Sequence, residues 1–588
     1  MQQLKHVLPY LRRHKPRIAI GVIAILAGTF FGVVQPYILR LAIDDLQKHM
    51  TGGDLLRYVL LFLGAAVGQS IFAFVQRSTV NRVSRFLEYD LRNAAFRHLQ
   101  ALDQGFYGEM HTGDLMARLT NDLNAVRQFV GMGMISLIST VIMLVVVAIL
   151  MLVINWKLAL VAFAVLPFVS ITMAVVSRTL QRRYRLVQDQ FGHVSTYAQE
   201  NFSGIRVVKA FVQEDLEIEA FGRTNEEYVT RNLSYVRLSG IMWPLMSFVV
   251  GIAMALVLYV GGTEVANREI TTGEFVQFNA YLAMLAWPMI ALGWVINMFQ
   301  QGAASMGRVM EVMNRRPAIR DTGRTLSSAQ VHGAIEFRHV GVKYDGVAVL
   351  KDVSFSVEHG STVAIIGMTG VGKTTLMSLV PRVLEVDEGE VLIDGLDVRR
   401  IPVETLRAAV GYVPQDTFLF SATLRENVMF GVRDASDWDV SEALETSRLS
   451  KDLEQFPKGL DTIVGERGVS LSGGQKQRTS LARAVLRDPS ILILDDAMSS
   501  VDTHTQAEIL SRLKEVMQQR TTLITAMRIS TVKDADKIVV LHAGRVAEQG
   551  THRELLLNDG LYARMYRREL LQQELEVDDE AVELVEDR

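Results

Sequence analysis

The chain has 588 residues, more than one hydrophobic core usually organises, so two or more domains are expected. Hydrophobic residues make up 49% of it and the mean hydropathy is positive, which indicates membrane-embedded segments. The formal net charge of -3 says little about partners, and no nucleic-acid partner is expected. The absence of cysteine excludes disulfides, thiol nucleophiles and thiolate metal sites.

The apolar residues are concentrated in the first half, in windows without charged residues. Each window is about 19 residues or longer, enough for a helix to cross roughly 30 Å of hydrocarbon. Buried helices of a soluble protein are the alternative, but such helices normally carry a polar face. We therefore expect an all-α transmembrane domain over residues 1–316, embedded in a lipid bilayer. Its six predicted spans are 18–39, 58–76, 128–156, 158–177, 238–263 and 275–307.

Basic residues in the connections predict the orientation. Segment 77–127 holds seven Lys/Arg and segment 178–237 holds nine, whereas the alternate connections hold three, one and one. Because positively charged loops stay inside, both termini are expected in the cytoplasm and the protein in the inner (cytoplasmic) membrane. The two long inside segments show helical spacing, and their tips, near 113–120 and 203–208, could touch a cytoplasmic domain.

No Asp, Glu, Lys or Arg lies inside a predicted span. Proton-driven transporters usually need such residues as relays, so the energy source is expected elsewhere in the chain. A polar linker is expected over 317–332, followed by short β-rich runs that alternate with helical patterns over 333–570. That alternation predicts an α/β domain with a largely parallel sheet. The acidic tail, 571–588, is expected to be disordered.

The stretch "GMTGVGKTT" follows a predicted strand and opens a helix, as a P-loop does. Its glycines allow backbone N–H groups to surround phosphate oxygens, Lys373 would reach the terminal phosphates of ATP, and the Thr374 hydroxyl would bind Mg²⁺. A plain glycine-rich turn is the alternative, but it does not require the strand, the spacing and the Lys-Thr pair together. The residues expected to bind ATP here are Gly367, Met368, Thr369, Gly370, Val371, Gly372, Lys373, Thr374 and Thr375.

Two further motifs follow the P-loop. "ILILDD" predicts a buried strand that ends at Asp495, placed to hold Mg²⁺. "LSGGQKQR" places a serine and two glycines at a helix start, where they would cap that helix or bind an anion. The residues concerned are Ser472, Gly473, Gly474 and Gln475.

In this order the motifs resemble those of an ATP-binding-cassette (ABC) transporter, and the six spans resemble its type IV exporter class. The resemblance, which covers nearly the whole chain, implies an α/β P-loop ATP-binding cassette behind the six-helix domain. It implies that Tyr344 stacks on adenine, that Gln415 contacts Mg²⁺, and that the 472–475 signature closes on ATP of the opposite subunit. It further implies that Asp502 lies in a loop crossing between sites, and that Glu466 lies where the intracellular tips meet the cassette.

The sequence departs from the family at two catalytic positions. The glutamate that normally follows the magnesium aspartate is Asp496, and the histidine that normally contacts the γ-phosphate is Met527. Asp496 is one methylene short, about 1.5 Å, and Met527 replaces neither the charge nor the hydrogen bond of histidine. Misplacing a base by about 1 Å costs on the order of 10²-fold, so hydrolysis is expected to be impaired. The alternative is that Asp496 works as a substitute and Met527 is drift or an engineered change.

An intact signature beside an altered catalytic pair is what a degenerate-site subunit of a heterodimeric bacterial multidrug exporter would contain. We therefore expect a partner half-transporter with intact glutamate and histidine, and a hydrophobic or amphipathic small-molecule substrate. The Met-bearing fifth and sixth spans suit varied ligands. The alternatives are a lipid or lipopolysaccharide flippase, a homodimeric exporter, and a regulator or ATP-gated channel.

Overall fold

The computed structural model describes residues 3–48, 51–321, 331–344, 346–465, 470–526 and 528–571. Within the chain two compact units are distinguished, and each is described by itself. The membrane unit comprises Met1–Gln100 and His111–Arg315, and the α/β unit comprises Ala101–Met110 and Arg316–Arg588. Glu466, Met527 and the expected tail from residue 572 onward lie outside the described residues.

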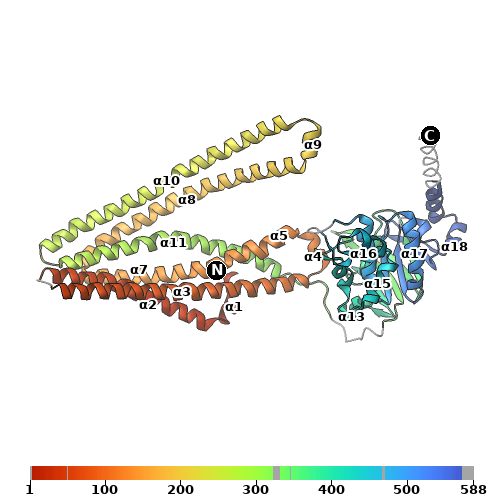
Figure 1. The fold of residues 1–588 in the computed structure, drawn as a ribbon, viewed down its shortest axis with the longest axis horizontal. Coiled ribbons are helices and arrows are strands. Elements are labelled where there is room, and N and C mark those ends of the chain that lie inside the picture. Colours follow the sequence, from red (N-terminus) through yellow and green to blue (C-terminus); the bar gives the residue numbers. More distant parts are fainter. Residues whose placement is uncertain are drawn as a thin grey trace. The chain divides into compact units, whose positions relative to one another are not determined.

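The membrane unit consists of helices. Helices α2, α3, α7 and α11 run alongside one another, whereas α8 and α10 pair in a long hairpin closed by α9 (Figure 1). The α-helices of this unit are α1 (Leu8–Arg12), α2 (Lys15–Leu46), α3 (Gly52–Gln100), α5 (Thr112–Ala117), α6 (Leu123–Gln128), α7 (Met134–Ile154), α8 (Trp156–Ser203), α9 (Ile205–Ala210), α10 (Glu214–Ala266) and α11 (Thr272–Met313). Short π-helical segments at Arg118–Asp122 and Phe129–Gly133 join α5, α6 and α7.

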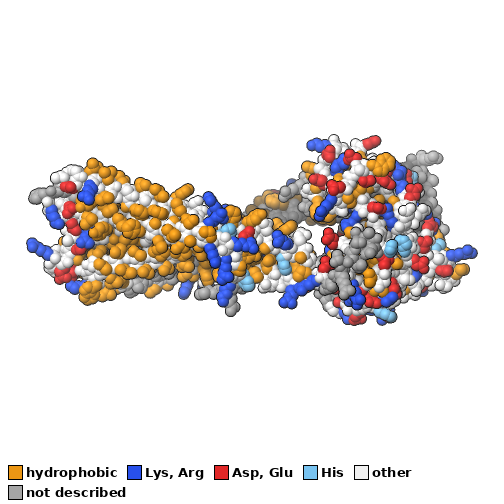
Figure 2. Space-filling view, turned by 90° about the horizontal axis from the view of Figure 1, so that it is seen from below, with side chains coloured by type: hydrophobic (Ala, Val, Ile, Leu, Met, Phe, Trp, Pro, Cys, Tyr) orange, Lys and Arg blue, Asp and Glu red, His pale blue; other side chains and the backbone are white. Residues whose placement is uncertain are grey.

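The predicted all-helical domain is confirmed. Among the described residues, four helical stretches are long and apolar enough to cross a membrane: Lys15–Leu46, Gly52–Gln100, Thr112–Ile154 and Glu214–Ala266. The other two expected spans, 158–177 and 275–307, lie on α8 and α11, which are not among these four stretches. Hydrophobic side chains cover most of the membrane unit's surface in Figure 2, as expected for a surface that faces lipid.

A polar cluster joins α2 to the start of α11. Thr271 caps α11 in a capping box with Glu274. The Asp44 carboxylate accepts hydrogen bonds from the Thr271 hydroxyl (3.0 Å) and from the Gly273 N–H (2.9 Å), and Arg40 forms an ion pair with Glu274 at 2.9 Å. These contacts satisfy N–H groups that the first turn of a helix leaves without partners.

The α/β unit contains two main sheets and one small ribbon. The strand order is β2-β1-β4-β5 in the antiparallel sheet and β12-β11-β3-β10-β9-β6 in the mostly parallel sheet, and β7 pairs with β8. The strands are β1 (Ile335–Tyr344), β2 (Val347–Val357), β3 (Thr362–Ile366), β4 (Glu388–Ile393), β5 (Leu396–Asp397), β6 (Val410–Val413), β7 (Ala422–Thr423), β8 (Ile463–Val464), β9 (Ile491–Asp495), β10 (Thr521–Thr525), β11 (Lys537–His542) and β12 (Arg545–Gly550).

Buried side chains lie on both faces of the larger sheet. One core joins the two sheets through residues such as Phe337, Val353 and Ile365, and a second joins the larger sheet to helices through Leu494, Ile509 and others. The helices of this unit are α4 (Gln104–Glu109), α12 (Lys373–Leu379), α13 (Val403–Ala408), α14 (Leu424–Val428), α15 (Asp437–Thr446), α16 (Gly473–Leu486), α17 (Thr503–Met517) and α18 (His552–Leu557). The expected α/β P-loop fold with a largely parallel sheet is confirmed.

Part of the segment 77–127, which is expected to lie inside, belongs to the α/β unit: Ala101–Met110. It contains α4, whose N-cap is Asp103. The Asp103 carboxylate accepts the Phe106 N–H, and Phe106 is buried. The tip expected from the sequence, 113–120, instead falls on α5 and the following π-helical segment of the membrane unit. An aspartate cap is a short signal, and inside a long helical pattern it is easily overlooked.

Candidate active site

The candidate site lies where parallel strands end. The P-loop follows β3, Asp495 ends β9, Thr525 ends β10, and Gln415 comes shortly after β6. These four strands are neighbours in one sheet, and Thr525 lies directly opposite Asp495 in the register. Because the carboxyl ends of parallel strands meet at one edge, the residues that follow them converge there.

The P-loop backbone requires glycine. Gly370 and Gly372 have φ values of 81° and 101°, a region that other residues rarely adopt. At Gly372 an added Cβ would also come within 2.7 Å of Leu350. Lys373 follows directly, and its Nζ donates hydrogen bonds to the carbonyl oxygens of Gly367 (2.7 Å) and Met368 (3.2 Å). The ammonium group is therefore held across the mouth of the loop.

A cavity of about 240 Å³ lies against this loop. It brings together the predicted magnesium and catalytic positions and most of the P-loop. Its lining residues are Val349, Thr369, Gly370, Gly372, Lys373, Thr374, Thr375, Gln415, Asp495, Asp496 and Thr525. Tyr344, Asp502 and the signature segment 472–475 are not among these described lining residues, and Tyr344 is 45% exposed at the end of β1.

The oxygen ligands around Asp495 fit Mg²⁺. Asp495 is only 1% exposed, and its Oδ1 accepts a hydrogen bond from the Thr525 hydroxyl at 2.8 Å. Its Oδ2 is buried without a hydrogen-bond partner among the described residues. Thr374 Oγ1 and Gln415 Oε1, which lie 3.4 Å apart, line the same cavity. Carboxylate, hydroxyl and amide oxygens are the donors that Mg²⁺ prefers, so these three residues would hold it.

Asp496 is half-buried in the same cavity beside the lysine. Its φ of 49° is left-handed, and its N–H donates to Thr525 Oγ1 at 2.9 Å. Burial and the neighbouring Asp495 raise the pKa of the Asp496 carboxyl, and Lys373 partly opposes this. Burial in turn lowers the pKa of the Lys373 ammonium. The family resemblance expects a glutamate base at this position, and the side chain present is one methylene shorter.

The signature segment forms the start of α16. Ser472 and Gln475 make a capping box, in which Ser472 Oγ accepts the Gln475 N–H at 3.2 Å and Gln475 Oε1 accepts the Ser472 N–H at 3.0 Å. Gly474 packs against the Ser500 backbone so closely that an added Cβ would lie 2.9 Å from the Ser500 carbonyl oxygen. The segment is therefore pre-formed within this chain, although it does not line this chain's own cavity.

Asp502 lies in the adjoining loop and caps α17. Its carboxylate accepts the Thr505 N–H at 2.8 Å, and this hydrogen bond lowers the pKa of Asp502. The structure thus gives Asp502 a local capping role, next to the serine that contacts the signature glycines.

Thr525 is a site residue that the sequence interpretation missed. Its hydroxyl donates to Asp495 and accepts the Asp496 N–H, so it orients both acidic residues. The available signal was a threonine at the last position of the strand "TTLIT", but threonine is common in strands and alone indicates little.

Comparisons with known proteins agree with this geometry. Residues 18–289 match the family model described as the ABC transporter transmembrane region, and residues 350–499 match the family model described as ABC transporter. YheI of Bacillus subtilis (strain 168), described as a probable multidrug resistance ABC transporter ATP-binding/permease protein, is 36% identical over 97% of this chain and 98% of its own. An ATP-dependent lipid A-core flippase of Syntrophus aciditrophicus (strain SB) is 34% identical over 96% of this chain and 94% of its own.

The chain belongs to the ABC transporter family. A solved structure of a bacterial Atm1-family ABC exporter with ATP bound is similar in fold as well, with a TM-score of 0.79 and 28% identity over 94% of this chain and 98% of that one. The chain is therefore a membrane protein of the ABC exporter type, with a transmembrane domain and an ATP-binding cassette, and it couples ATP to transport.

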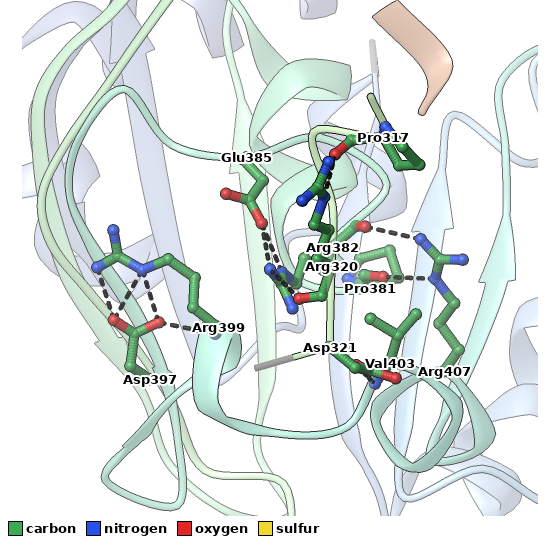
Figure 3. A network of polar contacts seen from close by, with 10 residues as sticks. All are labelled: Pro317, Arg320, Asp321, Pro381, Arg382, Glu385, Asp397, Arg399, Val403 and Arg407. Atoms are coloured by element: carbon green, nitrogen blue, oxygen red, sulfur yellow. Dashed lines mark hydrogen bonds and ion pairs between the residues drawn. The ribbon is translucent and has the colours of Figure 1, made fainter. Parts of the chain in front are cut away.

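In this ABC exporter the end of the P-loop helix is tied to the segment that enters the α/β unit (Figure 3). Arg382, just beyond α12, donates to the Arg320 carbonyl oxygen at 3.3 Å, and the Asp321 carboxylate accepts the Val403 N–H at 2.8 Å. Arg407 donates to the carbonyl oxygen of Arg382 at 2.8 Å. These bonds fix the far end of the helix whose first residue is Lys373.

Met527, which the family resemblance places at a catalytic position, and Glu466, the expected contact residue, lie outside the described residues. Close to the former, the Ile529 N–H donates to the Glu569 carboxylate at 2.6 Å. Glu569 lies beyond α18, in the last helical stretch of the described chain, so that stretch supports the loop after β10.

Proposed function

We propose that this chain exports amphipathic or hydrophobic compounds across the cytoplasmic membrane by alternating access, as the degenerate-site half of a heterodimer. The observation that carries the proposal is Asp496. It lines the cavity at the position where the family resemblance expects a glutamate base, and its side chain is one methylene shorter, while Lys373, Asp495 and the other groups expected to hold ATP keep the expected residue types. Binding groups are retained where a catalytic group is altered, which favours a site that holds ATP and cleaves it slowly.

The signature segment supports a shared site. Ser472 and Gln475 are pre-ordered by mutual hydrogen bonds, yet they do not line this chain's cavity. We therefore assign this segment to the ATP held by a second half-transporter. A good signature would then complete the partner's competent site, while this chain's own cavity would remain the slow one.

In this mechanism the chain's residues mainly bind ATP and orient the groups around it. The P-loop N–H groups and Lys373 would bind the phosphates, and Tyr344 would stack on adenine. Mg²⁺, when bound by Thr374, Gln415 and Asp495, would neutralise charge on the phosphates. Thr525 keeps Asp495 in its orientation by a hydrogen bond. ATP favours the closed pair because it contacts both halves only in that state.

Exposed apolar residues on the second inside tip also support a partner. Phe202, Phe211 and Val212 flank α9 and are 75%, 70% and 81% exposed. Large apolar side chains gathered at a polar helix end are typical of a contact surface. In our proposal the partner half covers this tip and receives the movement of the closing cassettes through it.

The relatives support two transport classes. The multidrug description of YheI favours varied amphipathic compounds, and the lipid A-core flippase at similar identity keeps a lipid substrate as the second candidate. Transport of a dye and of a fluorescent lipid by the same reconstituted preparation would separate them.

The proposal is tested by the ATPase rate of the purified chain alone and with its partner. We expect the chain alone to hydrolyse ATP slowly, and the double variant Asp496→Glu, Met527→His to raise that rate by about 10²-fold or more, because a well-placed base usually contributes on the order of 10²- to 10⁴-fold. The pair should be fast without these changes. Rapid hydrolysis by the unmodified chain as a homodimer would show the proposal to be wrong.

A further inference from the structure

Thr525 is placed between the two acidic residues of the ATP cavity. It is the last residue of β10, which lies between β3 and β9, and it lies directly opposite Asp495 in the parallel register. Both side chains line the cavity and are almost completely buried, with 2% and 1% exposed. Their contact is therefore shielded from water, which strengthens a hydrogen bond.

The hydrogen bonds of the Thr525 hydroxyl have a fixed direction. The Asp496 N–H donates to Thr525 Oγ1 at 2.9 Å. An ionised carboxylate can only accept, so the hydroxyl donates its single proton to Asp495 Oδ1, at 2.8 Å. Rotation of the hydroxyl proton away from Asp495 would leave a buried oxygen without its donor, which is costly. The hydroxyl thus fixes the position of Asp495 Oδ1.

This contact makes the two oxygens of Asp495 unequal. Oδ1 is engaged by Thr525, whereas Oδ2 is buried without a hydrogen-bond partner among the described residues. A buried acceptor of this kind usually has a ligand, an ion or a water as its partner. Oδ2 is therefore the oxygen that remains for a cation, together with the oxygens of Thr374 and Gln415, which line the same cavity.

We infer that Thr525 is a positioning residue that makes this cavity select Mg²⁺ over Ca²⁺, because it limits Asp495 to one ligating oxygen. Mg²⁺ requires a near-ideal octahedral arrangement, whereas Ca²⁺ takes more oxygens in a flexible arrangement and often both oxygens of one carboxylate. A hydroxyl held on Oδ1 favours the first ion and disfavours the second. The inference rests on the proposed ATP-holding role of the cavity and extends it to the ion that accompanies the nucleotide.

The test measures how ATP binding to this chain depends on each ion. The full-length chain in nanodiscs is photolabelled with 8-azido-ATP in the cold, at rising concentrations of free Mg²⁺ or free Ca²⁺. Thr525→Val keeps the shape of the side chain and removes the hydroxyl. It should raise the Mg²⁺ concentration for half-maximal labelling by about tenfold or more, the usual effect of removing a hydrogen bond to a metal ligand. The corresponding Ca²⁺ concentration should change by less than about twofold, because the freed Oδ1 can also bind Ca²⁺.

Two further variants of β10 serve as controls. Thr525→Ser retains the hydroxyl and should keep the Mg²⁺ requirement of the parent within about twofold. Thr522→Val makes the same chemical change on the same strand, at a hydroxyl that is buried without a hydrogen-bond partner among the described residues. It should behave as the parent. Because a half-maximal concentration does not depend on how much of the protein is folded, partial unfolding of a variant would not imitate the expected result.

An equal rise for both ions in Thr525→Val would overturn the inference, because a merely structural role of Thr525 predicts that outcome. Labelling of the parent that does not depend on Mg²⁺ would overturn it as well, as would an equal rise in Thr522→Val. A rise that is confined to Mg²⁺ and is absent in Thr525→Ser would support it. Failure of the heterodimer proposal would be seen in ATPase rates, whereas failure here is seen in the ion dependence of binding, so the two are distinguishable.

Discussion

Two parts of the α/β unit differ in how closely they follow the family pattern. The signature segment, Ser472–Gln475, keeps every expected residue, and the capping box of α16 holds it in shape. The catalytic edge beyond β9 and β10 carries Asp496 and Met527 where glutamate and histidine are expected. Our proposal accounts for this difference: the signature segment serves the ATP held by the partner, and the altered catalytic edge serves the ATP held by this chain.

The largest expected effect is on the signature side. Gly474→Asp places a side chain 2.9 Å from the Ser500 carbonyl oxygen and a negative charge at the start of α16. We expect the ATPase rate of the pair to fall on the order of 10²-fold or more, as when a group that stabilises the transition state is removed. ATP binding to this chain's own P-loop, measured by photolabelling, should stay close to normal. An unchanged ATPase rate of the Gly474→Asp pair would contradict the distinction between the signature segment and the catalytic edge.

A smaller effect is expected on the ATP-holding side. Lys373→Ala removes the ammonium group held over the P-loop by the carbonyl oxygens of Gly367 and Met368. Photolabelling of this chain should weaken about tenfold or more because a charged phosphate contact is lost. Hydrolysis by the pair should fall less than photolabelling does, since in our proposal the fast site belongs to the partner. An equal loss in both measurements would indicate that this chain's site also cleaves ATP.

The support of the loop after β10 can be tested through Glu569. Glu569→Ala leaves the Ile529 N–H without its acceptor, and Ile529 is buried. The loss should cost about 1 kcal/mol and lower the unfolding temperature of the α/β unit by roughly 2–4 °C. Glu569→Ala should also reduce the ATPase rate that the double variant Asp496→Glu, Met527→His has gained, when it is added to that variant. Arg568→Ala, the neighbouring exposed change, serves as the control.

The smallest effect on turnover is expected at Asp496 itself. Asp496→Asn should change the ATPase rate of the pair by less than about twofold, because a degenerate site contributes little to turnover. A loss of on the order of 10²-fold would instead make Asp496 a working base.

The same substitution tests the electrostatics of the cavity. Since the pKa of Asp496 is raised in the folded state, its favourable contribution to stability exists at low pH and is lost as the pH rises through that raised pKa. Asp496→Asn should therefore raise the unfolding temperature at pH 8 by about 1–3 °C, a modest value because partial exposure screens the repulsion from Asp495. The gain should shrink as the pH is lowered. Circular dichroism at several pH values would measure it.

Much of the fold and of this site could be predicted because the signals are local. The P-loop, the buried strand that ends at Asp495 and the cap at Ser472 each depend on a few adjacent residues. Thr525 and α4 were not predicted, because their roles come from contacts between distant parts of the chain. Thr525 reaches the acidic residues of the site because β10 lies between β3 and β9 in the folded sheet. The role of α4 depends in the same way on its membership of the α/β unit.

The membership of Ala101–Met110 in the α/β unit bears on how half-transporters can be recombined. An excised ATPase fragment that begins after Arg315 would lack a stretch encoded more than 200 residues earlier in the chain. Chimaeras that swap only the C-terminal half would pair a foreign ATPase with the original α4. Exchanging α4 together with that half would keep the α/β unit whole. Functional chimaeras should therefore be those in which α4 and the C-terminal half come from the same protein.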